Sequence, residues 1–253
     1  MPKVLIADNV SDVVCKIFDT NNIEYEKKVG LSEDELSAEI KGYDGLLIRS
    51  AVTVTKKIIE SSDTLKVIGR PGVGVDNVDL QASSEKNIVV MNTPLGNVQA
   101  TAELTFGIIH SLMRKIHIAN SSMHNKKWEK KKLIGNELLG KNIAIIGFGN
   151  IGKKVADFAK AYGMNIIVVS ETASSGDVDY LNAKVIKFDD MLSEADIITF
   201  HNKLSEKSKY IINSESLKQM KKNSIVINCA RGGIINEADM KEALEKEIIS
   251  GYG

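Results

Sequence analysis

The chain has 253 residues, 43% of them hydrophobic, which is enough for two globular domains and excludes disordered and fibrous proteins. Its 33 basic residues balance its 33 acidic ones, so no overall charge would draw it to nucleic acid or to an anionic membrane. The two cysteines, Cys15 and Cys229, exclude a disulfide framework and lack the spacing of a zinc site, and we expect no metal. No apolar run is long enough to span a bilayer. These features predict a cytoplasmic protein whose partners are small molecules or protein.

The first half of the chain alternates short β-branched runs with helical stretches, a pattern typical of a parallel sheet with crossover helices. We expect strands at residues 4–7, 24–28, 45–49, 65–69 and 88–91, and helices at residues 12–20, 33–41 and 56–62. Near-continuous apolar runs in several of these strands favour burial on both faces of the sheet.

A long stretch without proline, residues 98–125, has apolar residues three and four positions apart, such as Leu104, Ile108 and Leu112. This spacing predicts one long amphipathic helix. A helix of this length is suited to join two α/β domains, so we place the boundary at Asn97, with domains at 1–97 and 98–253. The basic segment 126–132 that follows is either a solvated turn or a local contact for an anion or a partner.

The second half again alternates strands and helices. We expect strands at residues 142–147, 165–169, 184–187, 196–201 and 224–228, and helices at residues 151–162, 214–220 and 237–245. Residues 248–253 have the pattern of the approach to a further strand. The whole chain is therefore predicted to be an α/β protein with two parallel sheets.

A glycine-rich turn in the second half carries the clearest chemical signal. Residues 147–152, GFGNIG, fit the pattern G-x-G-x-x-G between a predicted strand and a predicted helix. Gly147 would permit the tight turn, Gly149 the approach of a pyrophosphate, and Gly152 the packing of helix on strand. The N–H groups of Asn150 and Ile151 at the helix N-terminus would bind the phosphates. The segment predicts a dinucleotide-binding site.

The choice of dinucleotide depends on the end of the next strand. Sites of this kind place an acidic residue about twenty positions further on, where it binds the ribose hydroxyls. Ser170 occupies this position and Glu171 follows it, so a shift of one residue would let Glu171 bind the ribose. Because no arginine that would favour NADP is nearby, the sequence favours NAD as the cofactor.

Arginine is scarce, since only four of the 33 basic residues are arginine: Arg49, Arg70, Arg114 and Arg231. Three of them lie at or just after the ends of predicted strands, where ligands bind in open α/β sheets. A guanidinium group is a rigid, permanently charged fork suited to carboxylate and phosphate. These three arginines predict an anionic substrate with a carboxylate, with or without a phosphate. The glycine-rich loop after Arg70 is either a plain tight loop or a nest of backbone N–H groups for an anion.

Four motifs in order resemble those of the D-isomer-specific 2-hydroxyacid dehydrogenase family: residues 70–79 (RPGVGVDNVD), 92–97 (NTPLGN), 147–152 (GFGNIG) and 228–233 (NCARGG). The resemblance extends over essentially the whole chain. It implies a flavodoxin-like substrate-binding domain at 1–97 and a Rossmann NAD-binding domain at 98–253. It also implies an NAD-dependent oxidoreductase for a small anionic 2-hydroxy acid, and a homodimer joined through the long helix and the Trp128 region.

The resemblance assigns roles to particular residues. It implies that Arg231 binds the substrate carboxylate at the catalytic centre, that Arg49 and Arg70 hold the anionic substrate, and that Asn97 lies near the interdomain cleft. Further residues would border the substrate (Val73, Gly74) or the cofactor (Asn202, Cys229, Ala230). Within the family the match favours oxidation of 3-phosphoglycerate to 3-phosphohydroxypyruvate in serine biosynthesis. The alternatives are a hydroxypyruvate or glyoxylate reductase and a non-catalytic NAD-binding module.

The sequence also departs from the family pattern. Ser170 replaces the ribose-binding Asp, and residues 201–204 read His-Asn-Lys-Leu where the family has His-Thr-Pro-Leu. The Glu and the proton-accepting His of the family lie downstream of residue 253. The resemblance therefore implies a truncated chain that is inactive alone, with an incomplete NAD-binding domain. We expect the strand at 224–228 to have an open edge and the first domain to lack one packing element.

Overall fold

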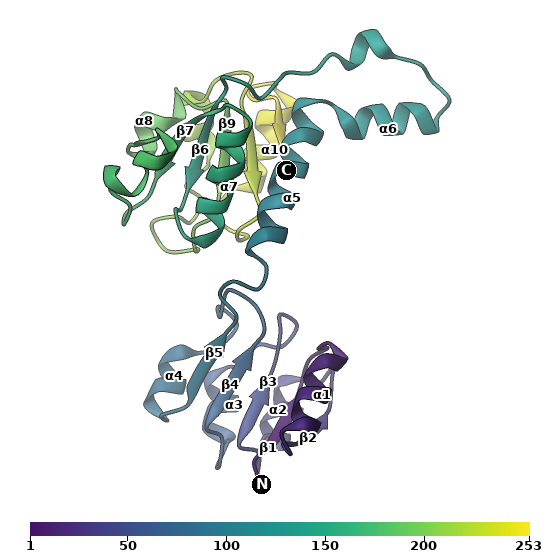
Figure 1. The fold of residues 1–253 in the computed structure, drawn as a ribbon, viewed down its shortest axis with the longest axis vertical. Coiled ribbons are helices and arrows are strands. Elements are labelled where there is room, and N and C mark those ends of the chain that lie inside the picture. Colours follow the sequence, from purple (N-terminus) through teal and green to yellow (C-terminus); the bar gives the residue numbers. More distant parts are fainter. The chain divides into compact units, whose positions relative to one another are not determined.

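The computed structural model describes all 253 residues, which divide into two compact units, Met1–Asn97 and Val98–Gly253. Each unit has one sheet with helices packed on it, as Figure 1 shows. Every pair of strands in both sheets is parallel. The predicted α/β fold with parallel sheets is confirmed.

The first unit contains a five-stranded sheet. Its strands are β1 (Lys3–Ile6), β2 (Glu24–Lys27), β3 (Gly45–Leu47), β4 (Val67–Arg70) and β5 (Val89–Asn92). Its helices are α1 (Asp12–Thr20), α2 (Glu33–Glu39), α3 (Lys56–Ser61) and α4 (Leu80–Glu85). The strand order is β2-β1-β3-β4-β5, the order of flavodoxin-like sheets, in which ligands bind where the order reverses between β1 and β3.

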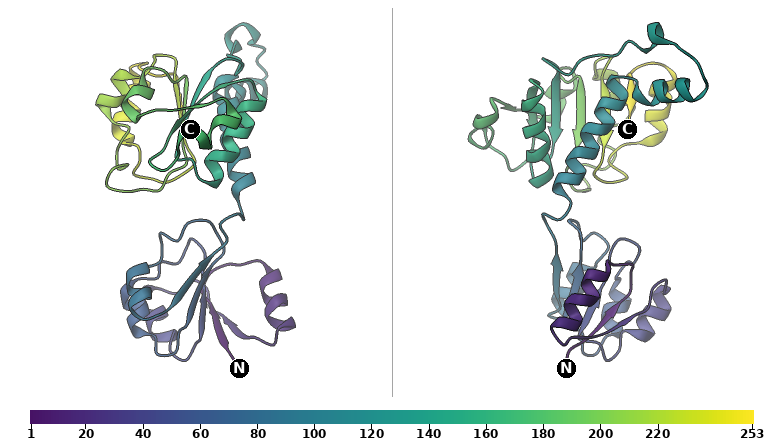
Figure 2. Two further views of the ribbon diagram at one scale, coloured as in Figure 1. Left: turned by 60° about the vertical axis from the view of Figure 1, so that its left-hand side comes forward. Right: turned by 45° about the vertical axis from the view of Figure 1, so that its right-hand side comes forward.

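The two faces of this sheet differ in how they are covered. One face packs against α2, α3 and α4, and its side chains, such as Leu5 and Ile68, are fully buried. The other face carries α1, none of whose residues is fully buried. Figure 2 shows α1 alone on its side of the sheet. Val89 and Met91 of the edge strand β5 remain 58% exposed, so part of the second face is open to solvent.

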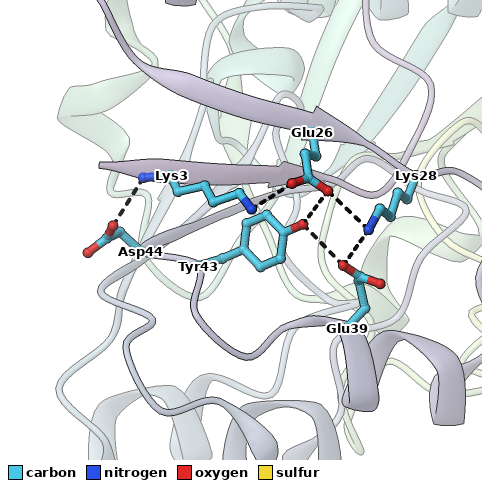
Figure 3. A network of polar contacts seen from close by, with 6 residues as sticks. All are labelled: Lys3, Glu26, Lys28, Glu39, Tyr43 and Asp44. Carbon is cyan, nitrogen blue, oxygen red and sulfur yellow. Dashed lines mark hydrogen bonds and ion pairs between the residues drawn. The ribbon is translucent and has the colours of Figure 1, made fainter. Parts of the chain in front are cut away.

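A polar network ties β1, β2 and α2 together (Figure 3). The Tyr43 hydroxyl lies 2.8 Å from Glu26 Oε2 and 3.1 Å from Glu39 Oε1. Lys28 Nζ pairs with Glu39 at 2.6 Å and with Glu26 at 3.0 Å, and Lys3 Nζ pairs with Glu26 at 2.5 Å. The two lysines lower the pKa of Glu26 to about 2. The network therefore stabilises the position of the edge strand β2 mainly when the Glu26 carboxylate is ionised.

The second unit contains a six-stranded sheet. Its strands are β6 (Asn142–Ile146), β7 (Asn165–Val169), β8 (Lys184–Val185), β9 (Ile197–Phe200), β10 (Ile225–Asn228) and β11 (Gly251–Tyr252). They lie in the order β8-β7-β6-β9-β10-β11, which is the order of Rossmann sheets. One face packs against α5 (Val98–Met113) and α7 (Asn150–Ala161), and the other against α8 (Phe188–Leu192), α9 (Ser214–Gln219) and α10 (Glu237–Glu245). Shorter elements complete the unit: α6 (Ile116–His124), η1 (Lys130–Leu133), η2 (Ser175–Asp177) and η3 (Asp179–Leu181).

The prediction of one helix over residues 98–125 is wrong, because the helix breaks between α5 and α6. Lys115 adopts a left-handed conformation with φ of 54°. The carbonyl of Met113, at the end of α5, accepts a hydrogen bond from the N–H of Asn136 at 2.8 Å. The segment that returns from α6 therefore provides a partner for a carbonyl at the end of α5. A Cβ atom on Gly135 would overlap the same carbonyl, so glycine allows this close crossing. None of the helices is long and apolar enough to cross a membrane.

The expected open edge beside the strand at 224–228 is also wrong. The strand β11 pairs with β10, and further hydrogen bonds run from Ser250 N–H to the Ser224 carbonyl and from Asn228 N–H to the Gly253 carbonyl, both at 2.8 Å. Val226 and Ile227 are fully buried. The further strand that we expected near residues 248–253 is confirmed, and it covers the edge of β10.

Candidate functional site

The carboxyl edge of the second sheet brings several predicted residues together. The register aligns Val169, Ile146, Phe200 and Asn228 on four adjacent strands, β7, β6, β9 and β10. The residues that follow them in sequence are therefore neighbours at one edge: Ser170, Gly147, His201 and Cys229. Adjacent strands are about 4.8 Å apart, so this row spans about 15 Å. The strand order reverses between β6 and β9 inside the row, which is where ligands bind in open α/β sheets.

The three glycines of the turn after β6 have different surroundings. Gly147 has a φ of 91°, and a Cβ atom there would lie 2.7 Å from the backbone nitrogen of Asn202. A Cβ atom on Gly152 would collide with the carbonyl oxygen of Gly147. A Cβ atom on Gly149 would meet nothing within 4 Å. Gly147 and Gly152 are therefore required by the fold, whereas Gly149 leaves open space above the turn.

The N-terminus of α7 begins after a glycine. Gly149 is the N-cap residue of the helix, and it makes no side-chain hydrogen bond to the first turn. The helix has 12 residues, so its aligned peptide dipoles give this end a partial positive charge. A helix N-terminus with a glycine N-cap and open space beside that glycine fits a diphosphate group.

The end of β7 holds the two residues expected to bind the ribose. Ser170 Oγ accepts hydrogen bonds from the N–H groups of Thr172 and Ala173, both at 3.2 Å, and so shapes the turn. The Glu171 carboxylate pairs with Lys207 Nζ at 2.7 Å and raises the pKa of that lysine. The negative charge at this strand end therefore lies on Glu171 and is opposed by a lysine.

Two buried polar atoms without a protein partner lie next to the glycine turn. His201 Nε2 is 3.0 Å from Thr199 Oγ1, but its Nδ1 has no partner. Burial lowers the pKa of His201 to about 4, so its imidazole is neutral at pH 7. Asn202 donates from Nδ2 to the Lys203 carbonyl at 3.0 Å, and its Oδ1 has no partner. Buried polar atoms are normally hydrogen-bonded, so this loop fits a polar ligand.

The turn after β10 positions Arg231. Asn228 accepts the N–H of Ala230 at its Oδ1, at 3.1 Å, and donates from Nδ2 to the Arg231 carbonyl, at 2.9 Å. Arg231 Nη1 donates to the Ala230 carbonyl at 2.8 Å. Cys229 is half-buried against the core, and its thiol is free. Sequence reasoning missed the bracing role of Asn228, although an Asn at a strand end before a turn is a signal for it.

The first unit has its own cavity, of about 570 Å³, at the carboxyl end of its sheet. It brings together Arg49, Arg70 and Asn97 of the predicted residues, but Val73 and Gly74 do not line it. The rest of the lining comes from the start of α1 and from neighbouring loops: Val10, Ser11, Val14, Ser50, Pro71, Gly72, Thr93 and Gly96. The hydroxyl groups of this lining were not predicted.

Neither arginine of the cavity is neutralised by an acidic side chain. No ion pair involves Arg49 or Arg70, and Arg70 Nε is buried without a hydrogen-bond partner. The Arg70 guanidinium lies over Gly72, where a Cβ atom would overlap its Nη1. The carbonyl of Val73 accepts a hydrogen bond from Asn92 Nδ2 at 2.7 Å, which ties the glycine loop to the end of β5. The cavity therefore offers two uncompensated positive charges to an anion.

Comparison with known proteins agrees with this geometry. Residues 106–253 match the family model described as "D-isomer specific 2-hydroxyacid dehydrogenase, NAD binding domain". The chain is 40% identical to a D-3-phosphoglycerate dehydrogenase of Synechocystis sp., over 99% of this chain and 45% of that protein. It is 41% identical to the enzyme of the same name from Methanocaldococcus jannaschii, over 97% of this chain and 47% of that protein. The chain thus spans about half the length of the curated relatives that it matches.

A solved structure shows the same fold. The TT0316 protein from Thermus thermophilus superposes with a TM-score of 0.90 and 28% identity, covering 99% of this chain and 80% of that one. The match to a domain described as NAD-binding confirms the prediction of NAD as the cofactor type. Because the family model covers more than half of the residues, the chain belongs to the D-isomer-specific 2-hydroxyacid dehydrogenase family.

Proposed function

We propose that the chain provides the NAD-binding and substrate-binding residues of an oxidoreductase that converts 3-phosphoglycerate and 3-phosphohydroxypyruvate into each other in serine biosynthesis. The observation that carries the proposal is the row at the edge of the second sheet, where the open turn at Gly149 follows β6 and the Arg231 turn follows β10, with only β9 between these two strands. The relatives named D-3-phosphoglycerate dehydrogenase support this choice of substrate.

The proposed cofactor residues fall into two groups. The turn and helix start would hold the diphosphate (Gly147, Gly149, Asn150, Ile151, Gly152), and the neighbouring strand ends would border the rest of the cofactor (Ser170, Glu171, Asn202, Cys229, Ala230). NAD, when bound, supplies the acceptor for the hydride that leaves the alcohol carbon. The open space at Gly149 and the unpartnered Oδ1 of Asn202 support these roles.

The proposed substrate residues are arginines and their neighbours. Arg231 would bind the carboxylate, because a guanidinium matches a carboxylate in a bidentate geometry. Arg49 and Arg70 would hold the phosphate-bearing end, with Asn97 of the same cavity bordering it. The absence of acidic partners at Arg49 and Arg70 supports these roles, since both charges are available to a ligand.

Proton transfer is proposed to be weak in these 253 residues. General acid–base catalysis contributes about 10²–10⁴-fold and works best when the pKa of the base is near the working pH. His201, with a pKa of about 4, is a poor base at pH 7. The other histidines belong to α5 and α6: His110, His117 and His124. We therefore expect the 253-residue chain to bind its ligands with negligible turnover.

The assembly is proposed to be a homodimer formed through α6 and the segment after it. Ile116, Ile118 and Met123 of α6 are each about half exposed, and Trp128 is 80% exposed. Large exposed apolar side chains close together mark interaction surfaces. The two free cysteines support a reducing, cytoplasmic compartment.

Substrate choice can be tested by binding. We expect Arg49→Ala to weaken binding of 3-phosphoglycerate by about tenfold, or about 1.4 kcal/mol, and to change binding of glycolate, a short unphosphorylated acid, much less. Isothermal titration calorimetry with both acids measures this. Equal losses for the two acids would reject the phosphorylated substrate and favour a hydroxypyruvate or glyoxylate reductase.

A further inference from the structure

The loop that carries Arg49 is held by a buried carboxylate. Arg49 follows β3, and its backbone N–H donates to Asp8 Oδ2 at 3.0 Å. The N–H of Ala51 donates to the same oxygen at 3.0 Å, and the N–H of Asn9 donates to Asp8 Oδ1 at 2.7 Å. Asp8 is only 6% exposed, so its burial is compensated by these three charge-assisted hydrogen bonds.

A second side chain holds the same loop from the other side. Asn77 Nδ2 donates to the carbonyl of Arg49 and to the carbonyl of Val52, both at 2.6 Å. The carbonyl of Asn77 accepts the N–H of Val54 at 2.7 Å. The peptide groups on both sides of the Arg49 Cα atom are thus bound by side chains from two other loops, those that follow β1 and β4.

This double attachment matters because nothing fixes the Arg49 side chain directly. Arg49 is exposed, makes no ion pair, and lines the cavity with Arg70. A flexible arginine loses conformational entropy when it binds an anion, and fixing its backbone beforehand lowers that cost. The position of Arg49 over the cavity therefore depends on its backbone, and the backbone depends on Asp8 and Asn77.

We propose that Asp8 and Asn77 are positioning residues that hold Arg49 ready for the anionic group of the substrate. The proposal rests on the proposed function, in which Arg49 binds that group. Neither residue would touch the substrate, since neither lines the cavity.

A double-mutant cycle tests this. The 253-residue chain and the variants Asn77→Ala, Arg49→Ala and the double variant are titrated with 3-phosphoglycerate by calorimetry. We expect Asn77→Ala to weaken binding about fivefold, because Arg49 is then less ordered. In the Arg49→Ala background the same change should have no further effect, whereas its effect on thermal stability should be the same in both backgrounds.

Thr64→Val is the matched control. Thr64 Oγ1 donates to the Tyr43 carbonyl at 2.9 Å, so this variant also removes a side-chain hydrogen bond to a backbone carbonyl in the same unit, but outside the cavity lining. We expect it to leave the affinity unchanged. If Asn77→Ala does not fold, Asp8→Asn takes its place in the cycle, since it removes the negative charge that accepts the Arg49 N–H but keeps the shape.

The outcomes separate this inference from the proposed function. If Arg49→Ala leaves the affinity unchanged, the proposed role of Arg49 fails, and the inference fails with it. If Arg49→Ala weakens binding but Asn77→Ala does not, or if Asn77→Ala weakens binding equally in both backgrounds, only the inference is overturned.

Discussion

The glycine turn after β6 allows the role of each glycine to be tested separately. Gly149 has φ of −81° and ψ of −162°, an extended conformation open to alanine, and a Cβ atom there meets nothing within 4 Å. Gly149→Ala should therefore fold normally, with a stability change within about 1 kcal/mol. Because the new methyl group takes the space proposed for the diphosphate, we expect NADH affinity to fall at least tenfold, or about 1.4 kcal/mol.

Gly152→Ala provides the opposite case. Its Cβ atom would lie against the carbonyl oxygen of Gly147, a backbone atom that moves only with the turn and with β6. Forcing a group into a packed site costs about 1–3 kcal/mol, so we expect a loss of about 3 kcal/mol in the free energy of unfolding.

Urea denaturation and calorimetric titration with NADH measure both quantities for each variant. If Gly149→Ala has the same affinity for NADH as the unmodified chain, the diphosphate binds elsewhere. Gly149→Ala that is as unstable as Gly152→Ala would refute the packing argument.

Three further predictions concern stability. Burial lowers the pKa of His201 from about 6.5 to about 4, so as the pH falls the unfolded chain binds this proton before the folded chain does, and stability is lost between pH 6.5 and pH 4. Urea denaturation at a series of pH values should show a loss of about 3 kcal/mol in the free energy of unfolding, and His201→Gln should lack this loss. Equal pH profiles for the two proteins would contradict this. Lys3 and Lys28 lower the pKa of Glu26 to about 2, so the contribution of Glu26 to stability is present above pH 4.5 and is lost as the pH falls towards 2. Glu26→Gln should therefore flatten the dependence of stability on pH in that window, and an unchanged slope would refute the role of the network. Met91 is 58% exposed, so Met91→Gln should change stability by less than about 0.5 kcal/mol in thermal denaturation; a large loss would show that this face is covered.

The fold could be predicted largely because its signals are local. Short apolar runs separated by helical stretches identify both parallel sheets, and the glycine turn marks the start of α7. The break before α6 could not be predicted, because the apolar spacing continues on both sides of Lys115, whereas the hydrogen bond at the break joins Met113 to Asn136, a residue distant in the sequence. Contacts of this kind leave no periodic trace in the sequence.

The site was predicted only as far as the chemistry of its side chains shows in the sequence. Scarcity of arginine identified Arg49 and Arg70, which line one cavity. The residues that hold Arg49 were missed, because Asp8 lies 41 positions from it and Asn77 lies 28 positions away. An aspartate or asparagine in a loop is common in any sequence, so only the folded chain shows which backbone groups it binds.

The most direct test of the central claim is a crystal structure of the chain grown with NADH. The account predicts the diphosphate on the N–H groups of Asn150 and Ile151 at the start of α7, and the adenosine ribose beside Ser170 and Glu171. A diphosphate bound away from this turn, or crystals at saturating NADH in which the turn holds no cofactor, would contradict it.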